Sequence, residues 1–337
     1  MAPKFIENLN DYFLIKGNIW LITITTIEIL FYIAYTVVYS IDKTDQGIEQ
    51  AQVYRWTLTA VLLLSIIYFL WHSILNKTLM ELISFIIMLI LTNVFFLQRE
   101  IILIVYLLNN NTVSDMETLQ LIVFIMSCIG VGGSIIALTL ILLIVRPVYL
   151  SMYEDVFLKI GANGNIWEVY KYFTLTKSFL KLDLLISVEF MITIYFLTYN
   201  TRDSLYYIAV DIFFSVAIFA NNIHGHLLIN RKLYKQFIAF VVIRCAIESY
   251  KMYRTITSAL GYTLALHDIP NDFSEEDKAT YQYSSIAFEV MGLISVVFLV
   301  VFMKKTIWTF NRNEFDLIRN NFTKDFYRLQ REDTLLS

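Results

Sequence analysis

The sequence predicts an all-α membrane protein, a polytopic bundle of eight transmembrane helices arranged as two parallel four-helix repeats. Its 337 residues are 58% hydrophobic and only 16% charged, with a mean hydropathy of +0.61. Eight apolar stretches are long enough to cross a bilayer, and polar residues recur in order between the two halves. Soluble chains carry roughly 25% charge and are about half apolar, which excludes the ordinary globular, disordered, collagen-like and disulfide-stapled classes.

Eight stretches satisfy the length requirement, because a helix crosses ~30 Å of hydrocarbon in about 20 residues. They cover residues 18–40, 55–75, 79–108, 118–145, 179–199, 204–229, 236–263 and 282–303. The first has no small-residue cleavage signal, so we expect it to be retained as a span. The seventh is the weakest because it contains four charged residues, and one central charge costs about 2.5–3.5 kcal/mol on insertion scales. Without it the chain would have seven spans.

Basic residues fall mainly on one side of the predicted bundle. With eight spans and a cytosolic N-terminus, seventeen Lys and Arg residues lie in inner segments. The outer segments hold only Lys43, Arg202 and Lys278, with Arg55 at a boundary. Because cytoplasmic loops carry such an excess, we expect both termini in the cytosol and the protein in the plasma membrane or an endomembrane.

Polar residues in the first half recur in the same order in the second half, at offsets between 154 and 162 residues. The matched pairs include Glu28 with Glu189, His72 with His226, Arg99 with Arg254, and Gly130 with Gly292. Four spans is an even number, so both copies would have the same orientation, and we expect a pseudo-twofold axis along the membrane normal. Chance matching of two similar compositions is the alternative.

The chain is therefore divided into a first repeat at 1–160, a second repeat at 161–305 and a cytosolic amphipathic, basic tail at 306–337. Residues 146–178 are too polar to span. We predict amphipathic helices over 149–160 and 166–180, separated by a glycine-rich stop at 161–165. The tail carries spaced apolar side chains that either pack beneath the bundle or hold a partner: Phe310, Phe315, Ile318, Phe322 and Phe326.

Ionisable residues inside the predicted spans form the candidate functional site. They are Glu28, Glu189, Asp211, Arg244, Glu248, Lys251 and Glu289. At 100° per residue, the charges of the seventh span lie on one helix face, which must turn toward protein or water. We predict that Arg244 pairs with Glu189 or Glu28, and Lys251 with Asp211 or Glu289. Such groups either line a hydrated route or form a static ion-pair network.

The remaining residues that could act in catalysis or bind a metal form no predicted site. No catalytic, metal or cofactor motif occurs, so we expect neither an enzyme nor a bound cofactor, and the net charge of −3 does not suggest nucleic acid as a partner. His72, His224 and His226 fall near the inner interface, where headgroup or backbone contacts are expected rather than a zinc site. Cys128 and Cys245 are expected to be buried. Asn110 begins a glycosylation sequon in an outer loop.

One segment carries a resemblance. Lys159-Ile-Gly-Ala162, then Tyr170, then Lys181-Leu-Asp183 leading into a span, resembles part of an uncharacterised family of polytopic membrane proteins found in fungi and other eukaryotes. The resemblance covers about residues 146–200. It implies a eukaryotic multi-span protein and supplies no activity or site residue.

Three kinds of function are compatible with these features. A transporter of a small solute or ion needs a polar path, which the charged layer between two repeats would provide. A receptor or sensor would couple an outer pocket to the cytosolic amphipathic helices, and a structural scaffold would use the charges only for packing. The sequence favours transport, with the lipid bilayer as the surrounding partner.

Overall fold

A computed structural model describes residues 4–44, 49–76, 78–110, 118–160, 164–198, 204–259 and 275–310, together with Phe315 and Ile318. This part of the chain is helical and contains no strand. Its eight long helices are α1 (Lys4–Thr44), α2 (Glu49–Asn76), α3 (Leu79–Asn110), α4 (Thr118–Ile160), α5 (Gly164–Thr198), α6 (Ser204–Asn230), α7 (Phe237–Ala259) and α9 (Glu275–Trp308). A short 3₁₀ turn, η2 (Tyr234–Gln236), joins α6 to α7.

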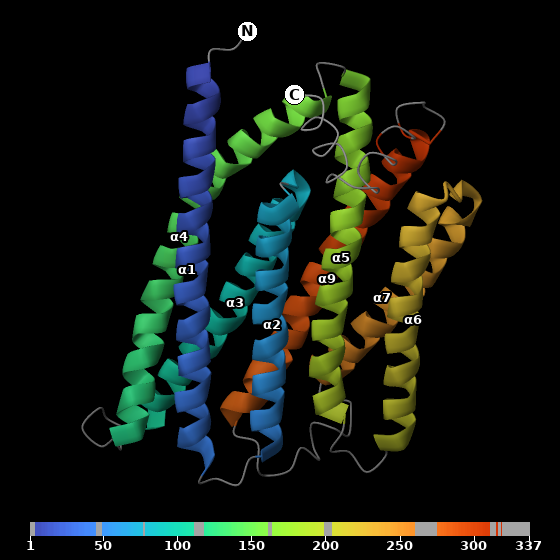
Figure 1. The fold of residues 1–337 in the computed structure, drawn as a ribbon. Coiled ribbons are helices and arrows are strands. Elements are labelled where there is room, and N and C mark those ends of the chain that lie inside the picture. The colour runs from blue at the N-terminus through green and yellow to red at the C-terminus, as the bar shows by residue number, and fades with distance from the viewer. Residues whose placement is uncertain are drawn as a thin grey trace.

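The long helices form two layers (Figure 1). One layer contains α1, α2, α5 and α6 side by side, and α4, α3, α9 and α7 lie behind them in the same order. Successive helices run in opposite directions. As a result α1 begins and α9 ends at the same end of the bundle, which we call the basic end. The described Lys and Arg residues at this end include Lys4, Lys16, Arg146, Lys159, Lys171, Lys177, Arg231, Lys232, Lys235, Lys304 and Lys305.

Each half of the chain closes its own four-helix ring. In the first half, α1 packs on α2 and α4, and α3 completes the ring. In the second half, α5 packs on α6 and α9, and α7 completes it in the same order. The halves meet through α2 and α3 against α5 and α9. A pseudo-twofold axis between the halves would place equivalent helices of the two halves at their interface, so that α2 and α3 would face α6 and α7. They face α5 and α9 instead, so our expectation of such an axis was wrong. The two rings instead lie side by side with their helices in the same order, as a translation along the layers would place them (Figure 1).

Two glycines at matched positions support the packing inside these rings. A Cβ built on Gly130 of α4 would overlap Glu100 Oε1 of α3, and one on Gly292 of α9 would lie 2.8 Å from Lys251 Nζ of α7. In each half the fourth helix therefore makes room, by a missing side chain, for an ionisable side chain of the third.

The surface of the bundle is that of a multi-pass membrane protein. Large apolar side chains such as Leu30, Leu143, Phe213 and Val297 are more than half exposed along the outer helices, far beyond the patches that soluble monomers show. Six helices hold described stretches long and apolar enough to cross a membrane: 16–41, 53–75, 79–108, 118–154, 208–230 and 285–308. The predicted spans in α5 and α7 are the two that fall short, because each carries more charge.

Helix α5 lies at the centre of the molecule. It packs against α9, α6, α2 and α3, and between Val169 and Ile194 only Lys171 is exposed. A helix shielded in this way from lipid does not need an apolar surface. The higher charge of α5 is therefore explained by its central position in the bundle.

The polar segment between the halves differs from the prediction. We expected separate amphipathic helices, but residues 149–160 continue α4 and residues 166–180 form the beginning of α5. Helix α4 continues through Pro147, and its later part runs obliquely toward α5 (Figure 1). A proline removes one helical hydrogen bond and bends a helix without always ending it. Polarity here marks emergence from the apolar region rather than a helix boundary.

The described part of the tail packs on the basic end of the second half. Phe310, Phe315 and Ile318 are buried. The Phe315 ring lies perpendicular to Phe173 of α5 at a centroid distance of 5.5 Å, and the Lys232 ammonium lies 5.2 Å from it. The expectation that the tail packs on the bundle is confirmed for these residues, while Phe322 and Phe326 lie outside the described ones.

The cysteine prediction was wrong. Cys128 and Cys245 are both free and exposed. In a soluble protein apolar neighbours indicate burial, but around a membrane bundle the outer surface is itself apolar, so the same neighbours do not distinguish inside from outside.

Candidate functional site

Helix α7 carries three charged side chains on the face that it turns to α5 and α9. Arg244, Glu248 and Lys251 are three or four residues apart, so they lie above one another. Their exposed fractions are 1%, 6% and 0%. The predicted stripe is therefore present and faces protein.

Arg244 is held by three neighbours. Its Nη2 atom lies 2.5 Å from Asp183 Oδ1 of α5 and 2.8 Å from Glu248 Oε1 on its own helix. The same nitrogen donates a hydrogen bond of 3.0 Å to Ser187 Oγ. Asp183 and Ser187 are one turn apart on α5, so one face of that helix supplies both contacts.

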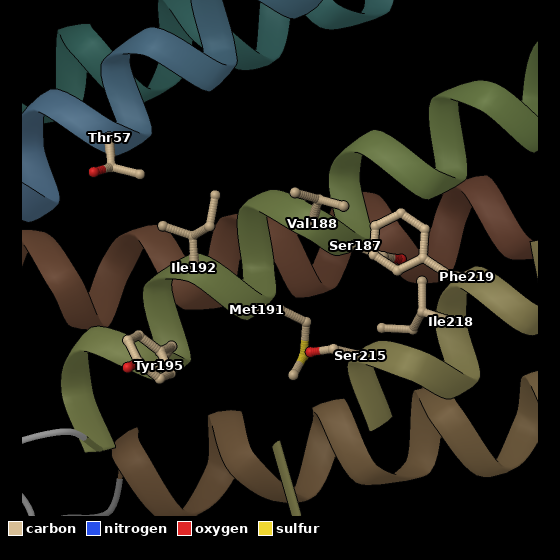
Figure 2. Close-up of a pocket in the computed structure, with 9 residues that line it drawn as sticks. All are labelled: Thr57, Ser187, Val188, Met191, Ile192, Tyr195, Ser215, Ile218 and Phe219. Carbon is tan, nitrogen blue, oxygen red and sulfur yellow. The ribbon is translucent and has the colours of Figure 1, made fainter. Parts of the chain in front are cut away.

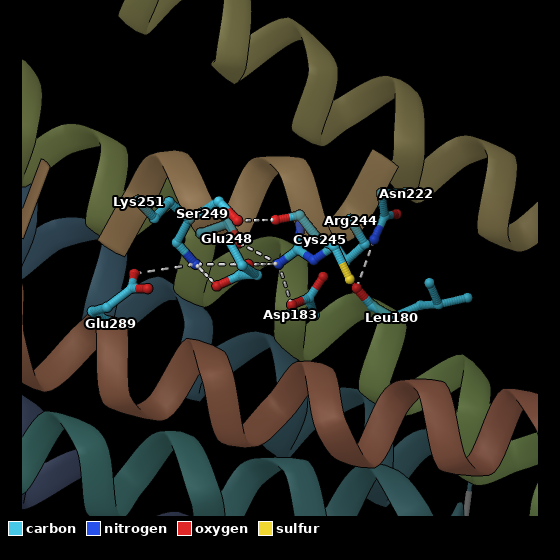
Figure 3. Close-up of polar contacts among 10 residues, drawn as sticks. Leu180, Asp183, Asn222, Arg244, Cys245, Glu248, Ser249, Lys251 and Glu289 are labelled. Carbon is cyan, nitrogen blue, oxygen red and sulfur yellow. Dashed lines mark hydrogen bonds and ion pairs between the residues drawn. The ribbon is translucent and has the colours of Figure 1, made fainter. Parts of the chain in front are cut away.

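Lys251 extends the interaction to α9. Its ammonium donates to both oxygens of Glu248, at 3.0 and 3.1 Å, and lies 3.8 Å from Glu289 Oε2. The result is a continuous buried series across three helices, drawn in Figure 3. We call it the charged chain: Asp183, Arg244, Glu248, Lys251 and Glu289.

A second, separate pair joins α6 to α7. Arg254 Nη2 lies 3.3 Å from Asp211 Oδ2, and the Tyr250 hydroxyl donates to the other carboxylate oxygen. The ring of Tyr250 stacks on Phe214 at 3.8 Å. This pair lies farther from the basic end than the charged chain, because Arg254 follows Arg244 by ten residues, or ~15 Å of helix.

The pairing predictions were only partly right. Lys251 contacts Glu289 as expected, but Asp211 pairs with Arg254, and Arg244 pairs with Asp183 instead of Glu189 or Glu28. Sequence reasoning missed Asp183 because it lies near the beginning of its span, where a charge is usually assigned to the headgroups. The available signal was its four-residue spacing from Ser187, which places two polar groups on one face of α5.

Glu189 belongs to no pair in the described part of the chain. It is fully buried on α5, and neither carboxyl oxygen has a hydrogen-bond partner. Ser65 of α2 lies close by, but its hydroxyl donates to the Val61 carbonyl. This carboxyl group therefore lies where the two halves meet, without a compensating charge.

Glu28 belongs to a polar cluster in the first half. The Tyr32 hydroxyl lies 3.3 Å from Glu28 Oε1, 3.0 Å from Asn93 Oδ1 and 2.9 Å from Ser134 Oγ. Helices α1, α3 and α4 meet at this tyrosine. The seven predicted residues thus separate into the charged chain, the Asp211 pair, Glu189 and this cluster.

A groove of about 370 Å³ opens between α2, α5 and α6 (Figure 2). It is mainly apolar, and Ser187 is part of its lining. Because Ser187 also accepts the hydrogen bond from Arg244, the groove reaches the charged chain at this side chain. Its lining residues are Thr57, Ser187, Val188, Met191, Ile192, Tyr195, Ser215, Ile218 and Phe219.

Two of the described histidines, His72 and His224, make side-chain contacts near the basic end. His72 Nδ1 lies 3.6 Å from Glu81 Oε1, and His224 Nε2 lies 3.0 Å from Gln236 Oε1. Within the described ranges no group of three or more His, Cys, Asp or Glu side chains is placed to hold a metal ion. Asn110 is the last residue of α3, and the rest of its sequon lies outside the described residues.

Comparison with known proteins adds no relative. No family model, no curated protein and no solved structure matches this chain. The resemblance over residues 146–200 therefore stays a prediction, and the site has to be interpreted from its own geometry.

Proposed function

We propose that the protein moves a small solute or an ion across the membrane along the charged chain. We further propose that the transported ion is a proton. The observation that carries the proposal is the composition of the chain. It contains three acids, Asp183, Glu248 and Glu289, but only two bases, Arg244 and Lys251. All five side chains are nearly inaccessible.

An unbalanced negative charge at this depth is costly. A proton bound by one carboxyl group, or a cation bound beside it, removes the imbalance. Of the two acids at the ends of the chain, Glu289 is the natural acceptor, because Asp183 lies only 2.5 Å from Arg244. Its only ion-pair contact in the described structure is the 3.8 Å approach of Lys251, and neither oxygen has a hydrogen-bond partner there.

The groove supplies the approach to the charged chain. A purely structural ion-pair network needs no opening, whereas here a cavity ends at Ser187, directly beside Arg244. A solute entering between α2 and α6 would meet the chain without first separating α5 from α7. This supports a route through the second half, rather than between two halves related by a twofold axis.

The proposal includes a topology in which all eight long helices cross the membrane and both termini lie in the cytosol. The shielding of α5, the inward pairing of the α7 charges and the Lys and Arg residues at the basic end support it. It also includes an ancestral duplication. The equal order of neighbours in the two rings and the matched Gly130 and Gly292 support that part.

Proton movement can be tested in vesicles that contain the purified protein and a pH-sensitive dye. A potassium gradient with valinomycin drives protons inward, and the internal pH is followed. We expect acidification with the natural protein and a loss of at least about tenfold in its rate for Glu289→Gln, because the amide cannot bind the proton.

The matched control is Glu168→Gln, which removes an exposed carboxylate from the beginning of α5 and should leave the rate unchanged. Gel filtration and thermal unfolding confirm that each variant is folded. A static network predicts a different result: no protein-dependent acidification, and an effect of Glu289→Gln on stability alone.

A further inference from the structure

Arg99 is a buried arginine in the first half, away from the charged chain. It lies on α3, eleven residues before Asn110, and is 2% exposed. Its guanidinium carbon lies 4.5 Å from the ring centroid of Tyr39 and 5.2 Å from that of Tyr35, both on α1. Neither terminal nitrogen, Nη1 or Nη2, has an acceptor among the described residues.

A second guanidinium approaches the same aromatic ring. The Arg55 carbon Cζ on α2 lies 4.6 Å from the Tyr39 centroid, and this side chain is also buried. Two permanent positive charges therefore lie against one tyrosine. We call Tyr35, Tyr39, Arg55 and Arg99 the arginine–tyrosine cluster.

Glu100 follows Arg99 in the chain, and its carboxylate interacts with the charge of Arg99 at longer range. This carboxylate lies against Gly130 of α4, however, and makes no ion pair with Arg99 in the described ranges. An arginine cannot discharge by losing a proton. Attraction to the tyrosine rings is weaker than the hydration that a buried guanidinium gives up. Within the described part of the chain, no anion is therefore bound directly to the Arg99 guanidinium.

We propose that the arginine–tyrosine cluster binds a phosphate-type oxyanion. Two parallel N–H groups of a guanidinium match two oxygens of such an anion, and both terminal nitrogens of Arg99 are available. The cluster lies toward the end of the bundle opposite the basic end, since Arg55 is six residues into α2, or ~9 Å. The phosphate comes from a phospholipid headgroup drawn into the cluster or from free inorganic phosphate.

Thermal unfolding of the purified protein measures this binding. In lipid-depleted detergent, sodium phosphate is titrated against sodium gluconate at equal ionic strength. In a second arm, protein extracted with its native lipids is analysed by native mass spectrometry. A ligand that binds only the folded state raises the melting temperature with its concentration.

The expected result is a saturable rise with phosphate, or one retained phospholipid per chain, and its loss in Arg99→Gln. The first outcome identifies a free anion as the source and the second a lipid headgroup. Arg146→Gln, which changes an exposed arginine of α4, should behave as the natural protein. Arg99→Lys keeps the charge but loses the paired donors, so the apparent affinity should fall at least about tenfold.

Three results would overturn the proposal. They are the absence of both phosphate stabilisation and retained phospholipid in the natural protein, retention of either by Arg99→Gln, and equal affinity in Arg99→Lys. If Arg99→Gln does not fold, the Arg99→Lys affinity alone decides between these outcomes.

Discussion

The carboxylate of Asp183 on α5 lies 2.5 Å from the guanidinium of Arg244 on α7, although the two residues are 61 positions apart in the chain. Both side chains are almost completely buried. This pair shows how a helix as polar as α7 is accommodated in an apolar bundle. Its charged side chains form ion pairs with residues of neighbouring helices, so none of them needs to face lipid.

Replacement of Asp183 by alanine should destabilise the protein strongly. It leaves Arg244 with one carboxylate fewer in a buried position, and breaking such a pair costs about 3–5 kcal/mol. The double variant Asp183→Leu with Arg244→Met should be less destabilised than Asp183→Ala, because it removes both buried charges. Unfolding in detergent measures both. If the double variant is the less stable one, Arg244 has other essential partners.

Replacement of glycine by alanine should change stability in opposite directions at closely packed and at open positions. At Gly130 or Gly292 a Cβ would meet Glu100 or Lys251, and overpacking costs about 1–3 kcal/mol. At Gly132 or Gly133 a Cβ meets nothing within 4 Å, so alanine should stabilise the helix by about 0.5–1 kcal/mol. Equal effects at all four positions would show that packing does not depend on these glycines.

Glu189→Gln should leave stability nearly unchanged, within about 1 kcal/mol. The carboxyl group is part of no ion pair in the described structure and its oxygens have no hydrogen-bond partner there, so an uncharged amide of the same shape breaks no charge pair and avoids burying a charge. The same unfolding assay applies, with Asp183→Ala as the contrasting variant. A loss as large as that of Asp183→Ala would mean that Glu189 has an essential partner.

Lys177 should react as an unusually nucleophilic amine. It precedes the apolar part of α5, and burial, together with the neighbouring Lys181 ammonium, lowers its pKa to about 8. The neutral amine is the reactive form, so acylation followed by mass spectrometry should reach its plateau above about pH 8. Lys181→Gln removes the like charge and should move this midpoint upward. An unchanged midpoint would exclude repulsion as one of its causes.

The sequence identified the helices well and their neighbours poorly. Apolar length located the long helices, six of which are apolar enough to cross a membrane. The 3.6-residue period correctly placed Arg244, Glu248 and Lys251 on one inward face. The period cannot say which helix lies opposite that face. Asp183 was therefore missed, and Glu189 was given a partner that it does not have among the described residues. Relative placement of the two halves depends on side-chain fit between α2, α3, α5 and α9, which no periodicity records.

Burial was also hard to predict for single residues. Around a membrane bundle apolar residues cover both the core and the surface, so Cys128 and Cys245 gave no signal of their exposure. The ends of α4 and α5 were also predicted wrongly. Polarity between 146 and 178 indicated a change of surroundings, while the backbone of α4 and α5 continued through it.

The most direct measurement determines on which side of the membrane α5 and α7 begin and end. In a Cys128→Ser, Cys245→Ser background, single cysteines at Asn165, Ser204, Lys232 and Lys278 are labelled in sealed, oriented vesicles with an impermeant maleimide. These positions lie at the beginning of α5, at the beginning of α6, between α6 and α7, and at the beginning of α9. If both helices cross, Asn165→Cys and Lys232→Cys react from one side, and Ser204→Cys and Lys278→Cys react only from the other. Labelling of Ser204→Cys or Lys278→Cys from the same side as Asn165→Cys and Lys232→Cys would contradict the account.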